Sequence, residues 1–241
     1  MKDISFLTNA PIAHRGYHNS KYPENSIGAF KNAIKYGYTI ELDVHLTKDN
    51  KIVVFHDRTL KRVCGVNKCI EELTYKELSK YNLFDTKYKI PLLKEVLDLV
   101  NDKVGLLIET KVFKFDGKLE EELSKLLDDY NGSFAIQSFN IFSINWFKKN
   151  RKYYIRGLLS SDFIDKKVSN LKKMIGKTLL ADIILKTDFI SYDIKALPNL
   201  FIKTKRKKKL VLSWNIKNND EYKKAILYSD NIIGENLKDY I

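Results

Sequence analysis

The stretch that decides the fold runs from residue 39 to residue 44 and reads Thr39-Ile40-Glu41-Leu42-Asp43-Val44. Apolar and acidic side chains alternate along it with the period of two that is typical of a β-strand. The three apolar side chains therefore face one side, where helices are expected to cover them, and the two acids face the other. Glu41 and Asp43 are thus predicted on the inner face of a barrel wall.

Short apolar segments recur along the whole chain and alternate with segments of helical period. This rhythm is typical of βα units around a parallel sheet. The predicted strands are Pro11–Gly16, Thr39–Leu46, Lys51–Asp57, Gly105–Lys111, Ser133–Phe139, Tyr154–Ser160, Asp188–Asp193, Lys209–Trp214 and Asn231–Gly234.

Helices are indicated where apolar residues share one face. A first helix has its N-cap at Asn25 or Ser26 and buries one side chain per turn, and a second carries a leucine stripe. The residues on these two faces are Ile27, Phe30 and Ile34, and then Leu119, Leu123, Leu126 and Leu127.

The number of strands depends on how the second and third candidates are related. Lys51–Asp57 follows Thr39–Leu46 after the turn residues Lys48-Asp49-Asn50, which indicates a continued strand or a hairpin at the barrel rim. If these two segments are counted as one unit, the chain has eight predicted strands. Because barrels of about 250 residues commonly form one domain, a single domain over residues 1–241 is expected.

The segment 58–91 breaks the rhythm. It contains both cysteines, Cys64 and Cys69, and one short helical piece at Leu73–Ser79, with no clear strand. We expect an insertion over one face of the barrel, after the strand of the second βα unit. Two cysteines are too few for a disulfide framework or a zinc site, so reduced thiols are expected.

Composition limits the compartment and the partners. The longest apolar stretches, such as Leu179-Leu180-Ala181, fall far short of the roughly 20 residues of a membrane span. The segment from Met1 to Leu7 carries Asp3 and lacks the apolar region of a secretory signal, so the cytoplasm is the expected compartment. A formal charge of +13 favours anionic partners such as phosphates, acidic lipids or nucleic acid, although a lysine-rich composition also explains it.

Two histidines occupy the positions expected of catalytic residues. His14 and His56 each end an apolar strand, and the carboxyl ends of barrel strands are where active sites are built. A single histidine at such a place is most often a structural hydrogen-bonding group. Two of them strengthen the functional interpretation.

The acidic residues point to a bound cation. Glu41 and Asp43 share the inner face of their strand, and in Gly105–Lys111 the same alternation places Glu109 and Lys111 on one face. Three carboxylates in a barrel interior repel one another unless a cation neutralises them. An all-oxygen set suits Mg²⁺ or Ca²⁺ better than Zn²⁺, and the alternative is a buried Glu/Lys salt-bridge network.

Five short motifs follow one another along the chain: His14-Arg15-Gly16, Glu24-Asn25-Ser26, Glu41-Leu42-Asp43-Val44, His56-Asp57 and Glu109-Thr110-Lys111. In this order they resemble the motifs of the glycerophosphodiester phosphodiesterase family. A looser match continues through Gln137-Ser138-Phe139 and Ser213-Trp214-Asn215, so the similarity spans nearly the whole chain. The final strand, Asn231–Gly234, departs from the family pattern and is followed by Glu235-Asn236.

The resemblance implies a TIM (β/α)8 barrel whose insertion follows the His-Asp strand. It implies that His14 and His56 form a general acid/base pair, and that Arg15 and Lys111 bind the phosphate. It also implies a divalent cation, Mg²⁺ or Ca²⁺, held by Glu41, Asp43 and Glu109.

The implied reaction is hydrolysis of glycerophosphodiesters to glycerol 3-phosphate and an alcohol. In the family picture the free glycerol hydroxyl attacks phosphorus, and water then opens the cyclic phosphate. A lysophospholipase D-like or phosphoinositide-type phosphodiesterase is the nearest enzymatic alternative, with lysophospholipids as substrates if the insertion offers an apolar groove. A non-catalytic membrane-surface binding protein is the alternative from another class.

For several further residues the sequence leaves two interpretations open. Glu24 is a candidate substrate-binding residue or a first-turn charge, with Asn25 as the N-cap. Trp214 either stacks on the substrate or fills the barrel mouth. His18 and His45 are expected to be loop or rim residues.

The basic tract Lys203–Lys209 precedes a strand and should lie at the amino-terminal face, opposite the site. A solvated helix end is expected there, with a weak contact to an anionic membrane surface as the alternative. No aromatic residues interleave the tract as a base-stacking surface would need, so nucleic acid is not expected as a partner.

Overall fold

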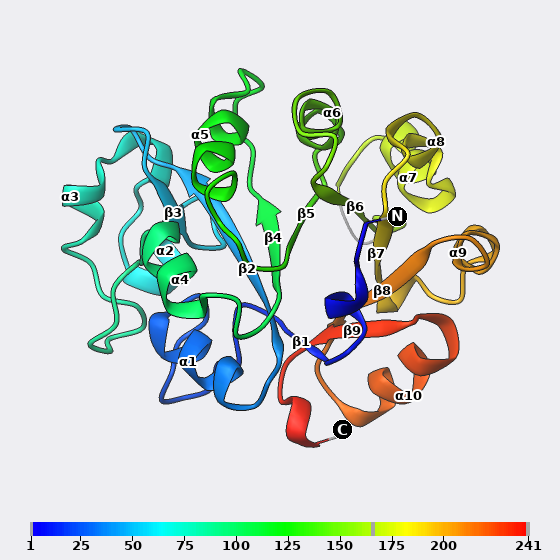
Figure 1. Cartoon of the computed structure of the whole chain (residues 1–241), viewed down its shortest axis with the longest axis horizontal. Coiled ribbons are helices and arrows are strands. Elements are labelled where there is room, and N and C mark those ends of the chain that lie inside the picture. The colour runs from blue at the N-terminus through cyan, green and yellow to red at the C-terminus, as the bar shows by residue number, and fades with distance from the viewer. Residues whose placement is uncertain (1, 165–166, 240–241) are drawn as a thin grey trace.

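Eight parallel strands close into a barrel in the computed structural model, which describes residues 2–164 and 167–239 (Figure 1). The ring closes because β1 pairs in parallel with β2 on one side and with β9 on the other. The predicted TIM barrel is therefore confirmed. Its strands are β1 (Ile12–Ala13), β2 (Thr39–Leu46), β4 (Leu106–Thr110), β5 (Phe134–Ser138), β6 (Ile155–Ser160), β7 (Phe189–Asp193), β8 (Leu210–Ile216) and β9 (Asn231–Gly234).

Helices form the outer layer of the barrel (Figure 1). The first of them begins after Ser26, whose side chain accepts a hydrogen bond from the backbone N–H of Ala29, so Ser26 is the N-cap. The outer helices are α1 (Ile27–Lys35), α4 (Leu93–Val100), α5 (Lys118–Leu127), α6 (Ile141–Asn150), α7 (Asn170–Thr178), α8 (Leu180–Leu185), α9 (Leu200–Arg206) and α10 (Asn219–Tyr228). Both predicted apolar helix faces pack against the core.

The segment after β2 forms a hairpin. Its second arm, β3 (Ile52–Val54), runs antiparallel to β2, with Val44 opposite Val54. Of the two predicted arrangements the hairpin is therefore correct, and β3 stays outside the ring of eight strands.

The insertion packs beside this hairpin and has an apolar core of its own. It contains α2 (Lys61–Cys64) and α3 (Tyr75–Leu78), and the thiols of Cys64 and Cys69 are free. Val53 and Phe55 from the hairpin pack against buried residues of the insertion, so the two form one unit. The buried residues of the insertion are Leu60, Val63, Ile70, Leu73, Leu78, Leu83 and Ile90.

The first strand is shorter than predicted, and the difference shapes the site. Pro11–Gly16 was expected to be extended, but β1 ends at Ala13 because Arg15 (φ 56°) and Gly16 (φ 77°) adopt left-handed backbone conformations. A Cβ on Gly16 would lie 2.9 Å from Cδ1 of Phe30, so this close turn requires glycine. The turn directs the chain away from the barrel immediately after His14.

The strand faces alternate as the sequence predicts. Ile40, Leu42 and Val44 pack outward among the helices. Inside the barrel, side chains including Leu107, Ala135 and Phe189 fill an apolar layer. The interior is thus packed, and the charged side chains described below lie nearer the carboxyl ends of the strands.

The basic tract covers the last residues of α9 and the turn that leads to β8, at the amino-terminal side of the barrel as expected. The expectation of a solvated helix end is wrong for part of it, because Lys205 and Lys209 each place Nζ 2.6 Å from the buried carboxylate of Asp182. Arg206 pairs with Asp230 at 2.8 Å. No helix within residues 2–164 and 167–239 is long and apolar enough to cross a membrane.

Candidate active site

Three carboxylates meet inside the carboxyl-terminal end of the barrel. Glu41 and Asp43 project from β2 and Glu109 from the neighbouring β4, where Asp43 and Glu109 are paired in register. All three are buried, with 2%, 1% and 7% exposure. One oxygen from each lies within 4.8 Å of the other two, so the structure brings the three predicted metal ligands together.

Two cations partly balance these acids. Lys111 places Nζ 2.9 Å from Oδ1 of Asp43 and 2.6 Å from Oε1 of Glu109. Arg15 places Nε 3.6 Å from Oδ2 of Asp43 and donates its backbone N–H to Oε2 of Glu41 at 2.8 Å. Three carboxylates therefore face two cations, which leaves a net negative charge in a buried place.

The pKa values of the acids reflect this imbalance. Burial, together with Asp43 and Glu109, raises the pKa of Glu41 well above its ordinary value. Burial also raises the pKa of Glu109 to about 6, against the opposing effect of Lys111. Burial acts on Asp43 in the same direction, but Lys111, His56 and Arg15 hold its pKa below the ordinary range. An additional cation would stabilise the ionised form of all three, so the donor set fits a hard divalent ion.

Each of the two predicted catalytic histidines is held by a carboxylate. Nδ1 of His14 lies 3.1 Å from Oε1 of Glu235, and Nδ1 of His56 lies 2.6 Å from Oδ1 of Asp57. When Nδ1 carries the hydrogen of these contacts, Nε2 presents a lone pair. Burial lowers the pKa of His14 to about 4 and also lowers the pKa of His56, which favours neutral imidazoles.

Both histidines line one cavity of about 130 Å³. Seven predicted site residues share its wall, and Gln137, Phe139, Leu159, Asn215 and Ile233 complete it. Asp43 and Glu24 are not among the lining side chains. The seven predicted residues are His14, Arg15, Glu41, His56, Glu109, Lys111 and Trp214.

Glu24 lies outside the cavity lining and binds Arg15, which lines the cavity. Its carboxylate accepts hydrogen bonds from Nη1 of Arg15 at 2.8 Å and from Nη2 of Arg62 at 2.7 Å. The alternative of a first-turn charge is wrong, because α1 begins only at Ile27. Asn25 is not the N-cap either, and its Nδ2 donates to Oδ2 of Asp43 at 2.8 Å.

Sequence reasoning missed Glu235 and Arg62. Glu235 follows β9 and also accepts a hydrogen bond from Nδ2 of Asn215 at 2.6 Å. Arg62, on α2 of the insertion, bridges Glu24 and Asp57 through contacts of 2.7 Å. The position of Glu235 at the carboxyl end of the last strand was the one available signal, whereas nothing local to the insertion marked Arg62.

The remaining aromatic candidates have defined places. Trp214 lines the cavity and packs edge-on against Phe139, with ring centroids 5.5 Å apart. His45 is buried, with Nε2 3.2 Å from the carbonyl oxygen of His56, and its ring stacks on Phe113. His45 therefore supports the segment that carries His56.

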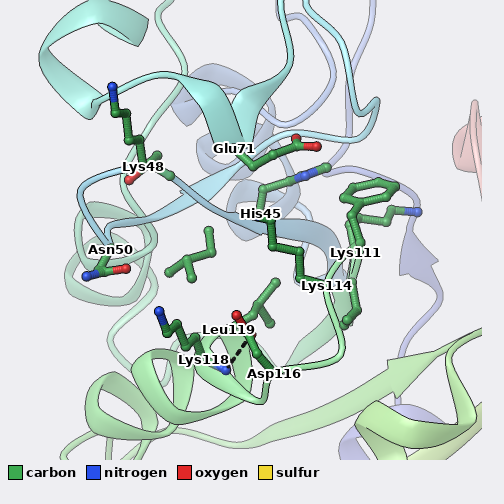
Figure 2. A pocket seen from close by; sticks show the side chains of 13 residues that line it. His45, Lys48, Asn50, Glu71, Lys111, Lys114, Asp116, Lys118 and Leu119 are labelled. Carbon is green, nitrogen blue, oxygen red and sulfur yellow. Dashed lines mark hydrogen bonds between the residues drawn. The ribbon is translucent and has the colours of Figure 1, made fainter.

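A second, polar cavity of about 200 Å³ lies between the β2–β3 hairpin and the start of α5 (Figure 2). Lys48, Lys114 and Lys118 contribute to its wall, with Glu71 and Asp116 as acidic counterparts. It shares Lys111 with the cavity of the histidines, and the ammonium group of Lys111 lies beside Asp43 and Glu109, within the charged cluster of that smaller cavity. The smaller cavity is therefore the candidate active site.

Comparison with known proteins assigns the class. Residues 14–232 match the model of the glycerophosphoryl diester phosphodiesterase family. The barrel, its charged cavity and this match define a TIM-barrel phosphodiesterase. The chain belongs to the glycerophosphoryl diester phosphodiesterase family.

Individual relatives agree with this assignment. A glycerophosphodiester phosphodiesterase of Caldanaerobacter subterraneus is 38% identical over 160 residues, which are 61% of this chain and 65% of that protein. One from Bacillus altitudinis is 31% identical over 179 residues, 69% of this chain and 72% of that protein. The matched segments thus span about two thirds of each relative.

Solved structures share the fold over nearly the full length. The glycerophosphodiester phosphodiesterase of Thermotoga maritima superimposes with a TM-score of 0.72 at 26% identity and 94% coverage of both chains. A phosphodiesterase of Oleispira antarctica, solved with the product sn-glycerol-3-phosphate, gives a TM-score of 0.79 at 21% identity, covering 96% of this chain and 94% of that one.

Proposed function

We propose that this chain hydrolyses glycerophosphodiesters to glycerol 3-phosphate and an alcohol, with a divalent metal ion and with His14 and His56 as the acid/base pair. The observation that carries the proposal is the arrangement of the cavity. Two imidazoles, each held at Nδ1 by a carboxylate, line the same small cavity as Glu41, Glu109 and the cation Lys111.

Glu41, Asp43 and Glu109 would hold the ion, for which Mg²⁺ and Ca²⁺ suit the all-oxygen donor set. A bound cation would stabilise negative charge on the phosphoryl oxygens. Arg15 and Lys111 add positive charge at the same wall and are the side chains that we expect to orient the phosphate.

In the first step one histidine accepts the proton of the free glycerol hydroxyl, whose oxygen forms a new bond to phosphorus. The bond from phosphorus to the alcohol oxygen breaks. The other histidine enters this step as an imidazolium, which the negative charge of the bound phosphodiester stabilises, and donates its Nε2 proton to that oxygen. The products are the alcohol and a cyclic glycerol phosphate.

In the second step the histidine that donated its proton accepts one from water, whose oxygen bonds to phosphorus. The cyclic P–O bond breaks, and the partner histidine returns its proton to the glycerol oxygen. Both imidazoles regain their starting states, and the net reaction consumes one water. The carboxylates of Glu235 and Asp57 keep the rings oriented through Nδ1 in both steps.

Known relatives support the choice of substrate. The phosphodiesterase of Oleispira antarctica was solved with sn-glycerol-3-phosphate, the product of the proposed reaction. A cytoplasmic location is the compartment that we continue to expect.

The first test is release of glycerol 3-phosphate from glycerophosphocholine and glycerophosphoethanolamine. We expect no product with EDTA and restored product when Mg²⁺ or Ca²⁺ is added. Product formation at full rate in EDTA would contradict the metal requirement.

The second test concerns the histidines. His14→Ala and His56→Ala should each lower turnover by about 10²–10⁴-fold, because general acid/base groups contribute that much. Circular dichroism checks that the barrel is intact. His18→Gln, in the same loop but outside the cavity lining, is the matched control and should keep its turnover. Near-full activity of either alanine variant would remove that histidine from the mechanism.

A second candidate substrate class is favoured by an apolar groove of about 480 Å³ beside the cavity. The groove shares Phe139 and Leu159 with the cavity of the histidines. Its further walls are apolar side chains such as Phe142, Leu171 and Ile175. It lies between the loop after β4, α6 and α7, and not in the insertion, where we expected such a groove.

This groove has the chemistry to bind an acyl chain, so lysophospholipids are the substrates that would use it. A human relative, 37% identical over 134 residues, is a lysophospholipase D. Ile175→Glu would place a charge in the groove and should raise KM for lysophosphatidylcholine by about tenfold or more, with glycerophosphocholine turnover unchanged. Equal effects on both substrates would contradict an acyl-binding role.

A further inference from the structure

A second group of metal-ligating side chains lies beside the catalytic cavity. His14, His18 and Glu235 each offer one ligand atom, and these atoms lie within 4.8 Å of one another. They come from three segments: the residue after β1, the loop that leads to α1, and the residue after β9. His18 does not line the cavity of the catalytic histidines.

We propose that His14, His18 and Glu235 bind a transition-metal ion such as Zn²⁺, and that the bound ion withdraws His14 from catalysis. The binding part stands on this cluster alone. The inhibitory part rests on the function proposed above, in which His14 transfers protons.

The donor set distinguishes this site from the three-carboxylate site. Two imidazole nitrogens and one carboxylate oxygen are ligands typical of Zn²⁺, with water completing the tetrahedron. Mg²⁺ and Ca²⁺ prefer oxygen ligands, which Glu41, Asp43 and Glu109 supply. The two sites should therefore select different ions.

The three ligands are held by contacts outside the cluster. The backbone N–H of His14 donates to the carbonyl of Gly234, and that of His18 donates to the carbonyl of Gly16 at 2.9 Å. Nδ2 of Asn215 donates to Oε1 of Glu235 at 2.6 Å. The hydrogen bond from Asn215 orients the carboxylate of Glu235 for a metal, and the two backbone hydrogen bonds fix the main chain that carries the imidazoles.

Binding at this site would change which nitrogen of His14 carries the hydrogen. Nδ1 of His14 faces Glu235 at 3.1 Å, so an ion between the two takes the lone pair of Nδ1. The hydrogen of the neutral ring then resides on Nε2. With that hydrogen in place, Nε2 can no longer accept a proton from a hydroxyl group.

The positive charges of Arg15 and Lys217 oppose the ion. Nζ of Lys217 lies 3.7 Å from Oε1 of Glu235, and its side chain is 59% exposed. Removing the charge of Lys217 should tighten Zn²⁺ binding, whereas removing the imidazole of His18 should weaken it. The chain thus offers two variants with opposite expected effects, neither of which touches the catalytic cavity.

The test measures Zn²⁺ binding to the whole chain by equilibrium dialysis, with excess Mg²⁺ present to occupy the three-carboxylate site. His18→Gln should weaken the binding of one Zn²⁺ equivalent by about tenfold or more, because one ligand is lost. Lys217→Gln should strengthen it by about threefold, as expected for one nearby charge screened by water. Zn²⁺ binding that is the same in wild type and His18→Gln would overturn the site.

Turnover supplies the second measurement. Zn²⁺ should inhibit the wild type, and the half-inhibitory concentration should rise about tenfold in His18→Gln, whose turnover without Zn²⁺ stays that of the wild type. If Zn²⁺ binds through His18 but does not inhibit turnover, the proposal that the ion keeps His14 from accepting a proton is wrong. A chain inactive on every glycerophosphodiester would instead reject the proposed function, and dialysis would still decide whether the site exists.

Discussion

Charge balance among single side chains governs the candidate active site. Three buried carboxylates face the two cations Lys111 and Arg15, so removing one acid changes the attraction for any further cation. Glu109 is the most informative to change, because it lies at the cavity wall and its pKa is raised to about 6 by burial.

Glu109→Gln should raise the Mg²⁺ or Ca²⁺ concentration needed for half-maximal activity, on the order of tenfold, because a neutral amide binds a hard cation less well. The measurement is a metal titration of turnover. Glu71→Gln, in the wall of the neighbouring polar cavity, is the matched control. Metal dependence that is unchanged in Glu109→Gln would make Glu109 a structural partner of Lys111.

The residues of the cavity differ in how far sequence could predict them. Glu41 and Asp43 follow from the period of two along β2, because alternation alone decides which face a side chain takes. Glu235 lies 221 positions along the chain from its partner His14. Arg62 lies 38 positions from its partner Glu24. Contacts of this kind depend on how the ring closes and how the insertion packs, which no local pattern encodes.

At the scale of elements, one carboxylate joins the end of α5 to the start of β6. Asp128 caps α5 and accepts hydrogen bonds from the side chains of Arg151, Tyr153 and Tyr154 at 2.7–3.0 Å. The hydrogen bond from Arg151 is the largest cause that lowers the pKa of Asp128 to about 2.

Asp128→Asn should lower the free energy of unfolding by about 1 kcal/mol at pH 7, since a charged acceptor is lost at a partly exposed place. A lowered pKa means that the ionised form stabilises the fold above the unfolded pKa of 3.8, and that this contribution is lost as the pH falls toward 2. Urea unfolding at pH 7 and pH 2.5 measures both effects.

The difference between wild type and Asp128→Asn should shrink at the lower pH. Asp129→Asn, which changes the exposed neighbouring acid, is the control and should behave like wild type at both values. A difference that grows on acidification would refute the role of the ionised carboxylate.

Most elements were predictable because the period of their apolar residues is local. β2 and β9 match their predicted bounds, and α1 begins at one of two predicted caps. β1 ended earlier than predicted because Arg15 and Gly16 turn left-handed, which depends on the close approach of Phe30. The sequence left open whether β3 continues β2 or pairs with it. β3 pairs antiparallel along an edge of β2, and this pairing is a property of the assembled sheet.

Across the whole molecule, the charge of +13 is not spread evenly over a solvated surface. Lys205 and Lys209 converge on Asp182, a carboxylate with 2% exposure that also accepts a hydrogen bond from Oγ1 of Thr187 at 2.6 Å. The composition predicted a basic surface, but which lysines are used inside the fold depends on the packing of α8 against α9 and β8. The basic tract is therefore in part a structural element.

Asp182→Asn should lower the free energy of unfolding by about 3 kcal/mol, because two partly buried ammonium groups lose their counter-ion. Chemical denaturation measures this loss. Lys208→Gln, which removes an exposed charge of the same tract, is the control and should stay within about 0.5 kcal/mol of wild type. A loss below about 1 kcal/mol for Asp182→Asn would show that both lysines reach solvent instead.

Closure of the ring also decides when the proposed catalytic residue His14 can be oriented. β1 has two residues and meets β9 in parallel, and His14 and Glu235 lie directly beyond the two ends of that pairing. The orientation of His14 is thus available only after the first and last strands have met. We therefore expect turnover to return during refolding only once the first and last strands have paired, and not with the secondary structure that forms before them.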